Sequence, residues 1–319
     1  MVPSRRAPTF SRMAAAWPKA LTSRLSGTGS VVPYRDHDAD TGARLDSAEP
    51  PPGRCAIICR MTDAARDTIR RRILDGETLF GAWTDLASPL ATEITGRAGY
   101  DWLIADLEHG APTEADLLAI LLAAEASGAA AFVRPQSGER LRIGRALDLG
   151  AAGIMVPRLD TAAQAEEAVT FLRYPPAGVR GVALRTRGAR LGTVGHADVG
   201  TLNAGIVGIV QIESPSAVHE ADAIAAIDGV DVLFVGPADL SHSLGIPGQF
   251  GNPTYLAALD AVVAACRHHG KAAGILLYDA PSFGPHLARG FRFLGVGSEG
   301  SFIAEGARAA LEAGRAAAP

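Results

Sequence analysis

The chain has 319 residues, a formal net charge of −4 and 48% hydrophobic residues. This length and composition allow one large domain, and the lack of a basic excess argues against a nucleic-acid partner. No apolar stretch approaches the roughly 20 residues of a membrane-spanning helix, so we expect no membrane partner. Three cysteines are too few for a disulfide framework, and without a secretory core segment we expect a cytoplasmic protein.

Residues 1–60 differ in composition from the rest of the chain. They are rich in Pro, Ser, Arg and Gly, and we expect a disordered extension, or sequence upstream of a true start at Met61. The part before Tyr34 also weakly resembles an organelle transit peptide. Cys55 and Cys59 have a spacing that a zinc site could use, but no second Cys/His pair lies nearby, which favours two incidental thiols.

Residues 61–319 alternate apolar runs with stretches of helical periodicity. The helical stretches include Thr113–Ser127, Thr161–Leu172 and Pro253–His269. Continuous apolar runs are typical of strands buried on both faces, and strands that alternate with helices imply parallel pairing. Because the length is close to the roughly 250 residues of a (β/α)8 barrel, we predict a single-domain TIM barrel. The eight predicted strands are Leu79–Trp83, Trp102–Asp106, Ala130–Arg134, Gly153–Pro157, Ile206–Glu213, Val232–Gly236, Ala272–Leu277 and Arg292–Gly297.

A doubly wound open sheet is the alternative fold. It requires a glycine-rich phosphate fingerprint directly after an early strand, and none is present. Gly295-Val-Gly297-Ser-Glu-Gly300 has the GxGxxG spacing, but it follows the last predicted strand. We interpret it as the loop after strand eight, with anion binding as the alternative. The long segment between strands four and five, Leu184–Asn203, is expected to cover the site.

Acidic residues stand at the ends of the fifth and sixth predicted strands. Glu213 ends the fifth strand, and Asp239 follows the sixth. Because neighbouring barrel strands lie about 4.8 Å apart, both carboxylates can reach one ion. Mg²⁺ or Mn²⁺ suits such a partial oxygen shell and leaves positions open for substrate oxygens. The alternative is that each acid caps the helix that follows it.

Groups suited to proton transfer and charge stabilisation end two further strands. His109 follows the second strand after Asp106, and its imidazole titrates near neutral pH, as a general base requires. Arg134 ends the third strand, where a guanidinium suits an enolate or carboxylate oxygen. A salt bridge to a neighbouring strand end is the structural alternative for Arg134.

Two further features favour binding of a small acid. Gln211 points to the same side of its strand as Glu213, because side chains alternate along a strand. The backbone N–H groups of Ala238 and Asp239 open a predicted helix and could hold a substrate carboxylate.

Six motifs, in this order and spacing, resemble the metal-dependent (class II) pyruvate aldolases of the HpcH/HpaI aldolase/citrate lyase family. The resemblance covers about Thr68 to Ala310, nearly all of the chain after the first 60 residues. The motifs are Gly99-Tyr-Asp-Trp102, Asp106-Leu-Glu-His109, Val133-Arg134-Pro135, Tyr174-Pro-Pro-Ala-Gly-Val-Arg-Gly181, Gln211-Ile-Glu213 and Gly236-Pro-Ala-Asp-Leu-Ser241.

The resemblance implies roles for matching catalytic residues. His109 looks like the proton acceptor, and Asp148 matches the acid that raises the basicity of that histidine. Arg134 looks like the group that stabilises the transition state. Asp106 stands where it could orient His109.

The resemblance also implies ligands and substrate contacts. Glu213 and Asp239 resemble ligands of a divalent metal, either Mg²⁺, Mn²⁺ or Co²⁺. Gln211, Ala238 and Asp239 resemble contacts to the pyruvyl part of the substrate. We expect Trp83, Leu276–Tyr278 and the segment Leu184–Asn203 to shape the aldehyde half of the pocket.

The activity that this family implies is cleavage of a 4-hydroxy-2-oxo acid to pyruvate and an aldehyde through a pyruvate enolate. No Schiff-base lysine is needed, which agrees with a chain whose only lysines, Lys19 and Lys271, end no predicted strand. The family also implies a homo-oligomer, a trimer or a hexamer. A CoA-thioester lyase or an oxaloacetate decarboxylase would use the same enolate chemistry. A barrel that binds a small acid without catalysis is the alternative of a different class.

Overall fold

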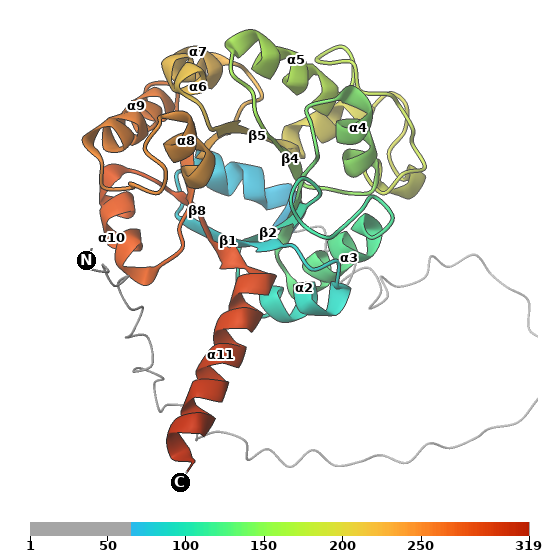
Figure 1. The fold of residues 1–319 in the computed structure, drawn as a ribbon. Coiled ribbons are helices and arrows are strands. Elements are labelled where there is room, and N and C mark those ends of the chain that lie inside the picture. The colour runs from blue at the N-terminus through green and yellow to red at the C-terminus, as the bar shows by residue number, and fades with distance from the viewer. Residues whose placement is uncertain (1–64, 319) are drawn as a thin grey trace, which may run out of the picture. The chain divides into compact units, whose positions relative to one another are not determined.

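The computed structural model describes residues 65–318, which form a closed barrel of eight parallel strands in chain order (Figure 1). The predicted (β/α)8 barrel is therefore confirmed. The predictions for residues 1–60, for a start at Met61 and for Cys55 and Cys59 lie outside the described residues. The strands are β1 (Leu79–Thr84), β2 (Trp102–Asp106), β3 (Ala130–Arg134), β4 (Gly153–Val156), β5 (Val207–Ile212), β6 (Val232–Val235), β7 (Ala272–Leu276) and β8 (Phe293–Ser298).

Helices connect successive strands and form the outer layer of the barrel (Figure 1). Within residues 65–318, no helix has the length and apolar character needed to cross a membrane. The barrel unit ends at Gly306, and the last helix continues beyond that residue to Ala317. After a first helix over residues 65–74, the helices are α2 (Pro89–Gly96), α3 (Leu117–Ser127), α4 (Arg140–Asp148), α5 (Ala162–Leu172), α6 (Pro215–His219), α7 (Ala221–Ala226), α8 (Pro237–Ser243), α9 (Pro253–His268), α10 (Ala280–Arg289) and α11 (Glu299–Ala317), with short 3-10 helices η1 (Arg190–Gly192) and η2 (Val199–Gly205).

Local side-chain chemistry explains where the helices begin. Helix α5 starts at a capping box, in which Thr161 and Gln164 each bond to the other's backbone N–H. Helix α3 starts four residues later than predicted, because Thr113 donates its N–H and hydroxyl to Asp116, at 2.9 and 2.7 Å. This side-chain turn competes with the first helical turn.

Alternate strand positions fill the barrel interior with apolar side chains. In β2, Trp102 and Ile104 belong to the interior cluster, whereas Leu103 packs toward the surrounding helices. The Trp102 ring stacks on Phe293 with 4.3 Å between ring centroids. A Cβ atom on Gly81 would lie 1.9 Å from the Trp102 ring, so glycine in β1 leaves the space that this indole fills.

The helix over residues 65–74 closes the end of the barrel where the strands begin. Ile69 and Ile73 from this helix join the interior cluster. Arg70 forms a 3.0 Å ion pair with Asp231, a fully buried acid directly before β6. Because this end is closed, the carboxyl ends of the strands are left to form a site.

The prediction that Leu184–Asn203 covers the site is wrong. The segment follows α5 and leads into β5, so it lies at the amino ends of the strands. Arg187 in this segment donates to the carbonyl oxygen of Leu149, directly after α4, at 3.2 Å. Arg190 pairs with Asp67 on the first helix at 2.6 Å. A connection from a helix to the next parallel strand must return to the strand's amino end, which the gap length alone does not reveal.

Replacing Gly81 by alanine should destabilise the barrel by about 2–3 kcal/mol, because the new methyl group would overlap the Trp102 ring. Urea unfolding followed by circular dichroism measures the change. Gly144→Ala is the matched control, since a methyl group on Gly144 in α4 would meet only open space and the helix should gain about 0.5–1 kcal/mol. Equal stability of both variants would contradict the packing argument.

Candidate active site

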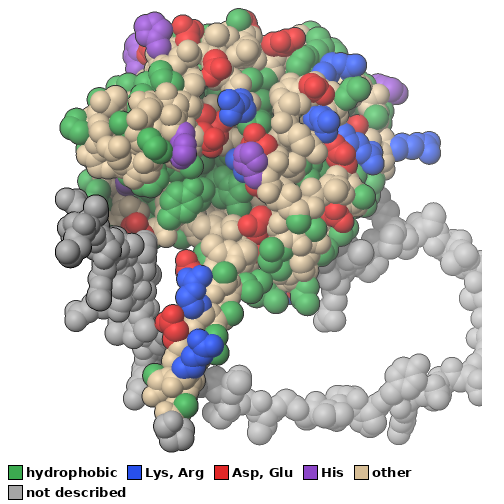
Figure 2. Space-filling model, viewed as in Figure 1, with side chains coloured by type: hydrophobic (Ala, Val, Ile, Leu, Met, Phe, Trp, Pro, Cys, Tyr) green, Lys and Arg blue, Asp and Glu red, His purple; other side chains and the backbone are tan. Residues whose placement is uncertain are grey.

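A cavity of about 330 Å³ opens at the carboxyl ends of the strands. Figure 2 shows the hollow in this face, with apolar side chains inside it and charged side chains and histidines around it. Of the predicted site residues, all except Asp148 line the cavity, namely Trp83, Asp106, His109, Arg134, Gln211, Glu213, Ala238 and Asp239. The remaining lining residues are Asp85, Phe234, Gly236, Pro237, Leu276, Tyr278, Gly297, Ser298 and Ser301.

Two carboxylates, Glu213 and Asp239, form an acidic end of this cavity. Glu213 follows β5 and is only 8% exposed, and Asp239 lies in the first turn of α8. Burial raises the pKa of Glu213 to about 7, and repulsion from Asp239 and Glu108 acts in the same direction. The positive charge of Arg134 opposes this shift only in part. Among the described residues, the charge of Arg134 therefore offsets only part of the cost of burying this carboxylate.

Neither acid acts as a helix cap, which removes the structural alternative for this pair. Ser214 caps α6, and its hydroxyl accepts from the helix backbone. Gly236 is the N-cap of α8, so Asp239 lies inside the helix. A Cβ atom on Gly236 would lie 2.7 Å from a Glu213 carboxylate oxygen, so glycine is needed for the carboxylate to lie there.

The groups around the acidic pair fit a hard divalent cation and a small carboxylate. Gln211 donates from Nε2 to Glu213 at 2.9 Å, and its Oε1 atom is buried without a hydrogen-bond partner among the described residues. Carboxylate and amide oxygens are the ligands that Mg²⁺ and similar ions prefer. The N–H groups of Ala238 and Asp239 lie in the first turn of α8, where no intrahelical acceptor is available to them.

Arg134 is held in place by two acids. Its Nε and Nη2 atoms donate to Asp106 at 2.9 and 2.7 Å, and Nη1 lies 3.3 Å from Glu108. Burial alone would raise the pKa of Asp106, but the bonds from Arg134 hold that pKa below its usual value. The salt bridge considered for Arg134 is thus present, and it orients a charged guanidinium that lines the cavity.

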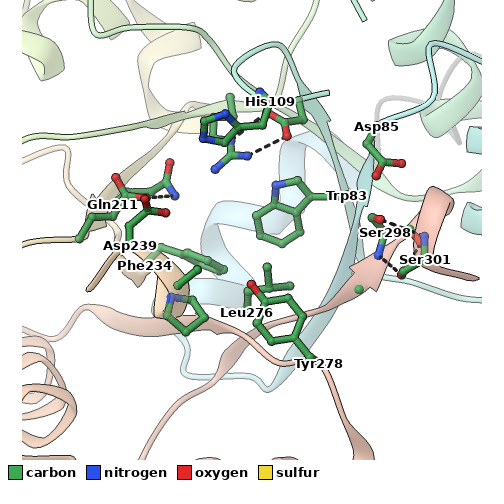
Figure 3. A pocket seen from close by; sticks show the side chains of 17 residues that line it. Trp83, Asp85, His109, Gln211, Phe234, Asp239, Leu276, Tyr278, Ser298 and Ser301 are labelled. Atoms are coloured by element: carbon green, nitrogen blue, oxygen red, sulfur yellow. Dashed lines mark hydrogen bonds and ion pairs between the residues drawn. The ribbon is translucent and has the colours of Figure 1, made fainter. Parts of the chain in front are cut away.

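His109 lies at the mouth of the cavity, with its side chain 65% exposed. Asp106 accepts a hydrogen bond from the backbone N–H of His109 at 3.2 Å. Asp106 therefore orients the turn that carries His109 rather than bonding to the imidazole. The imidazole Nε2 lies 3.7 Å from Glu108, and Figure 3 shows His109 at the wall of the cavity.

Asp148 is the one predicted site residue that the structure does not bring to the cavity. It ends α4, which runs from the carboxyl end of β3 back to the amino end of β4. Its carboxylate accepts a 3.0 Å hydrogen bond from Arg180, a buried side chain that lies over the Tyr174 ring. Within one chain the contact that we predicted between Asp148 and His109 is therefore absent, because the two residues lie at opposite ends of the barrel.

The wall opposite the acidic pair contains residues that sequence reasoning missed. Trp83, Leu276 and Tyr278 line the cavity, as expected, whereas Leu277 is buried in the core, and Asp85, Ser298 and Ser301 line the cavity too. Asp85 follows Trp83 by two residues, so strand alternation was a signal that could have found it. Ser298 pairs with Trp83 across β1 and β8, a register that no local pattern reveals.

The GxGxxG stretch is the junction between β8 and α11, as we interpreted it. The N–H groups of Ser298 and Ser301 each donate to the other's hydroxyl oxygen, at 2.9 and 3.2 Å, and the N–H of Gly300 donates to Asp85 at 3.0 Å. Because these donors are already paired within the protein, the alternative of an anion site has no support here.

A second group of possible metal ligands lies away from the cavity. In the part of the chain that the structure describes, Asp222, His268 and His269 are the one set of at least three such side chains close enough to share an ion. Both histidines bond to the same Asp222 oxygen, at 2.9 and 3.1 Å. Asp222 and His268 are exposed, so this set of side chains lies on the surface near the end of α9.

A closed parallel barrel with an acidic pair and an ion-paired arginine at its carboxyl rim is typical of a TIM-barrel enzyme. More specifically, the chain belongs to the HpcH/HpaI aldolase/citrate lyase family, whose pattern matches residues 79–305. The suspected family is therefore confirmed.

Individual relatives are aldolases. The chain is 41% identical over 219 residues to a 5-keto-4-deoxy-D-glucarate aldolase from Klebsiella pneumoniae, covering 69% of this chain and 85% of that protein. It is 39% identical over 234 residues to a hydroxypyruvate/pyruvate aldolase from Roseobacter denitrificans, covering 73% and 91%. The crystal structure of a family member from Burkholderia cenocepacia superposes with a TM-score of 0.74 at 37% identity, covering 78% of this chain and 99% of that one.

Binding of Mn²⁺ should weaken as the pH falls through about 7, because the ion requires the charged form of Glu213 and must displace its proton. Calorimetry in buffers of different ionisation enthalpy measures the protons released. We expect release of about 0.9 proton at pH 6 and close to none at pH 8.5. Glu213→Gln should abolish this release, whereas the exposed control Glu166→Gln on α5 should keep it. A release that does not change with pH would contradict the assignment.

Proposed function

We propose that this chain is a divalent-metal-dependent aldolase that cleaves a 4-hydroxy-2-oxo acid into pyruvate and an aldehyde. One observation carries the proposal. Buried Glu213 lies near Asp239, and Arg134, the one Lys or Arg among the described residues that line the cavity, is already paired with Asp106. A divalent cation would balance the charge of the acidic pair.

Glu213 and Asp239 would hold the cation, and Mg²⁺, Mn²⁺ and Co²⁺ suit their oxygen atoms. When bound, such a cation supplies Lewis-acid polarisation of the substrate's 2-oxo group. The N–H groups of Ala238 and Asp239 receive the substrate carboxylate at the start of α8, where the helix dipole favours an anion. Gln211 fixes the Glu213 carboxylate through its 2.9 Å hydrogen bond.

His109 transfers the proton in this reaction, and Arg134 stabilises the negative charge that develops. His109, directly or through a water, takes the proton of the C4 hydroxyl while the C3–C4 bond breaks and an aldehyde forms. The electron pair of the broken bond becomes the enolate of pyruvate, and a proton returned to C3 completes pyruvate. Arg134, held by Asp106, stabilises the negative charge of the enolate.

The placement of basic residues argues against a CoA-thioester lyase and against an aldolase that uses a Schiff-base lysine. Arg185, Arg187 and Arg190, which could have bound the phosphates of CoA, belong to the segment at the amino ends of the strands. Lys271 lies directly before β7 and donates to Ile227 at 3.4 Å, so it is not placed to form a Schiff base in the cavity.

We also propose that the enzyme is a cytoplasmic homo-oligomer, either a trimer or a hexamer. Apart from its own subunits, it binds a small 2-oxo acid as its substrate. Exposed apolar side chains support self-association, with Leu90 and Ile94 on α2 exposed by 66% and 64%. Ile303 and Leu311 on α11 are also exposed. Analytical ultracentrifugation tests this proposal, and a monomer at micromolar concentration would contradict it.

Pyruvate release from a 4-hydroxy-2-oxo acid should stop in EDTA and return with Mg²⁺, Mn²⁺ or Co²⁺, because the acidic pair alone cannot polarise the 2-oxo group. A lactate dehydrogenase coupled assay measures the pyruvate. Glu213→Ala should prevent the return at metal concentrations that restore the parent enzyme. Turnover that survives complete chelation would reject the proposed function.

The His109→Ala variant should lose about 10²–10⁴-fold in kcat, the usual contribution of a general base, and should still bind Mn²⁺. The coupled assay and calorimetry measure the two properties separately. His196→Ala is the matched control, since His196 is exposed in the segment at the opposite end of the barrel. Unchanged turnover in His109→Ala would show that another group takes the proton.

A further inference from the structure

The cavity wall opposite the acidic pair carries an inference about the aldehyde half of the substrate. We propose that Asp85 and Ser298 on this wall select a neutral, hydroxylated aldehyde and disfavour an aldehyde that ends in a carboxylate. This inference rests on the proposed aldolase function and names the substrate class of the same site.

The two ends of the cavity are separated by an aromatic side chain. Figure 3 shows Gln211 and Asp239 on one side, Asp85 and Ser298 on the other, and Trp83 between them. Asp85 follows β1 and Ser298 ends β8, and these strands are neighbours in the barrel. A substrate whose keto-acid half lies at the acidic end therefore extends past Trp83 toward Asp85 and Ser298.

The hydrogen bonds on this wall leave one acceptor and one donor free for a ligand. Asp85 uses Oδ1 to accept the N–H of Gly300 at 3.0 Å, which orients the carboxylate and leaves Oδ2 without a described donor. The Ser298 hydroxyl oxygen accepts the N–H of Ser301 at 3.2 Å. The hydroxyl proton of Ser298 has no acceptor among the residues that the structure describes. Ser301 is already committed, since its hydroxyl donates to the Ser298 carbonyl oxygen and accepts the Ser298 N–H.

A free carboxylate oxygen beside a free hydroxyl proton complements an alcohol. A substrate hydroxyl donates to Asp85 and accepts from Ser298, so both wall groups are satisfied by one ligand group. A ligand carboxylate cannot donate to Asp85, and it would leave the Asp85 oxygen unpaired in a partly enclosed space.

The charge on this wall also opposes an anion. Among the described lining residues, no Lys or Arg lies beside Asp85 to balance a second negative charge. Behind the wall lies a further acid, Glu299, which is only 2% exposed and accepts a 2.8 Å hydrogen bond from Thr92. Burial raises the pKa of Glu299 to about 7, and the charge of Asp85 adds to that shift. The repulsion of a carboxylate-bearing aldehyde therefore comes from Asp85, because the raised pKa of Glu299 favours its neutral form.

A matched pair of aldehydes tests the inference in the direction of synthesis. Glyceraldehyde and tartronate semialdehyde differ only in a terminal CH₂OH group or carboxylate. In either addition, the pyruvate methyl carbon loses a proton and bonds to the aldehyde carbon, whose oxygen gains a proton, so no oxidant or reductant is needed. We expect kcat/KM with glyceraldehyde to exceed that with tartronate semialdehyde by about tenfold or more.

Two variants separate charge from hydrogen bonding. Asp85→Asn keeps an acceptor for the Gly300 N–H. It should lower the ratio of kcat/KM with glyceraldehyde to kcat/KM with tartronate semialdehyde by about threefold or more, mainly by raising kcat/KM for the anionic aldehyde. Ser298→Ala should lower kcat/KM for glyceraldehyde without improving the anionic aldehyde. Glu166→Gln removes the same charge from an exposed position on α5 and should leave the preference unchanged.

Exchange of the pyruvate methyl protons in D₂O, followed by NMR with Mg²⁺ present, distinguishes the two possible failures. If the parent enzyme shows no metal-dependent exchange, the proposed function and this inference both fail. If exchange occurs, the inference alone is overturned by either of two results. Either the parent enzyme has the higher kcat/KM with tartronate semialdehyde, or Asp85→Asn changes kcat/KM by the same factor for both aldehydes. Should Asp85→Asn fail to fold, the preference of the parent enzyme and the effect of Ser298→Ala decide the question.

Discussion

The site depends on a surplus of negative charge that the barrel holds at its carboxyl rim. Arg134 forms ion pairs with both Asp106 and Glu108, which fix its guanidinium in one orientation. Glu213 and Asp239 have no such partner in the described part of the chain, and burial with mutual repulsion raises the pKa of Glu213 to about 7. In the proposed function, the guanidinium stabilises an enolate oxygen, and the acidic pair would hold a divalent cation.

The barrel interior makes this charge arrangement possible. Aromatic rings fill the space below the cavity, where Trp83 meets Trp102 and Phe234 at centroid distances of 5.7 and 5.5 Å. Inward-facing glycines leave room for these rings, as Gly295 does for Trp83, whose ring would lie 2.4 Å from an added Cβ. Such a packed interior resists the collapse of the rim, so side chains at strand ends keep their positions despite electrostatic repulsion.

In the proposed function, the family motifs and the cavity wall recognise different halves of the substrate. The aldolases to which this chain is similar carry names that specify a glucarate, a rhamnonate or a hydroxypyruvate/pyruvate substrate. The recurring motifs hold the acidic pair and the arginine, which suit the keto-acid half common to such reactions. The wall formed by Asp85 and Ser298 lies outside those motifs, and its free donor and acceptor are where selection of the aldehyde half would reside.

The sequence by itself determined the barrel and most of its rim, because apolar runs mark buried parallel strands and because side chains that directly follow them share one end of the barrel. Glu213, Asp239, Arg134 and His109 could be found in this way. Tertiary structure decided which residues far along the chain meet at that end. Ser298 lies beside Trp83 because of the register between β8 and β1. Asp148 and residues 184–203 lie at the opposite end of the barrel. The direction of each connection, rather than its spacing in sequence, determines the end at which it lies.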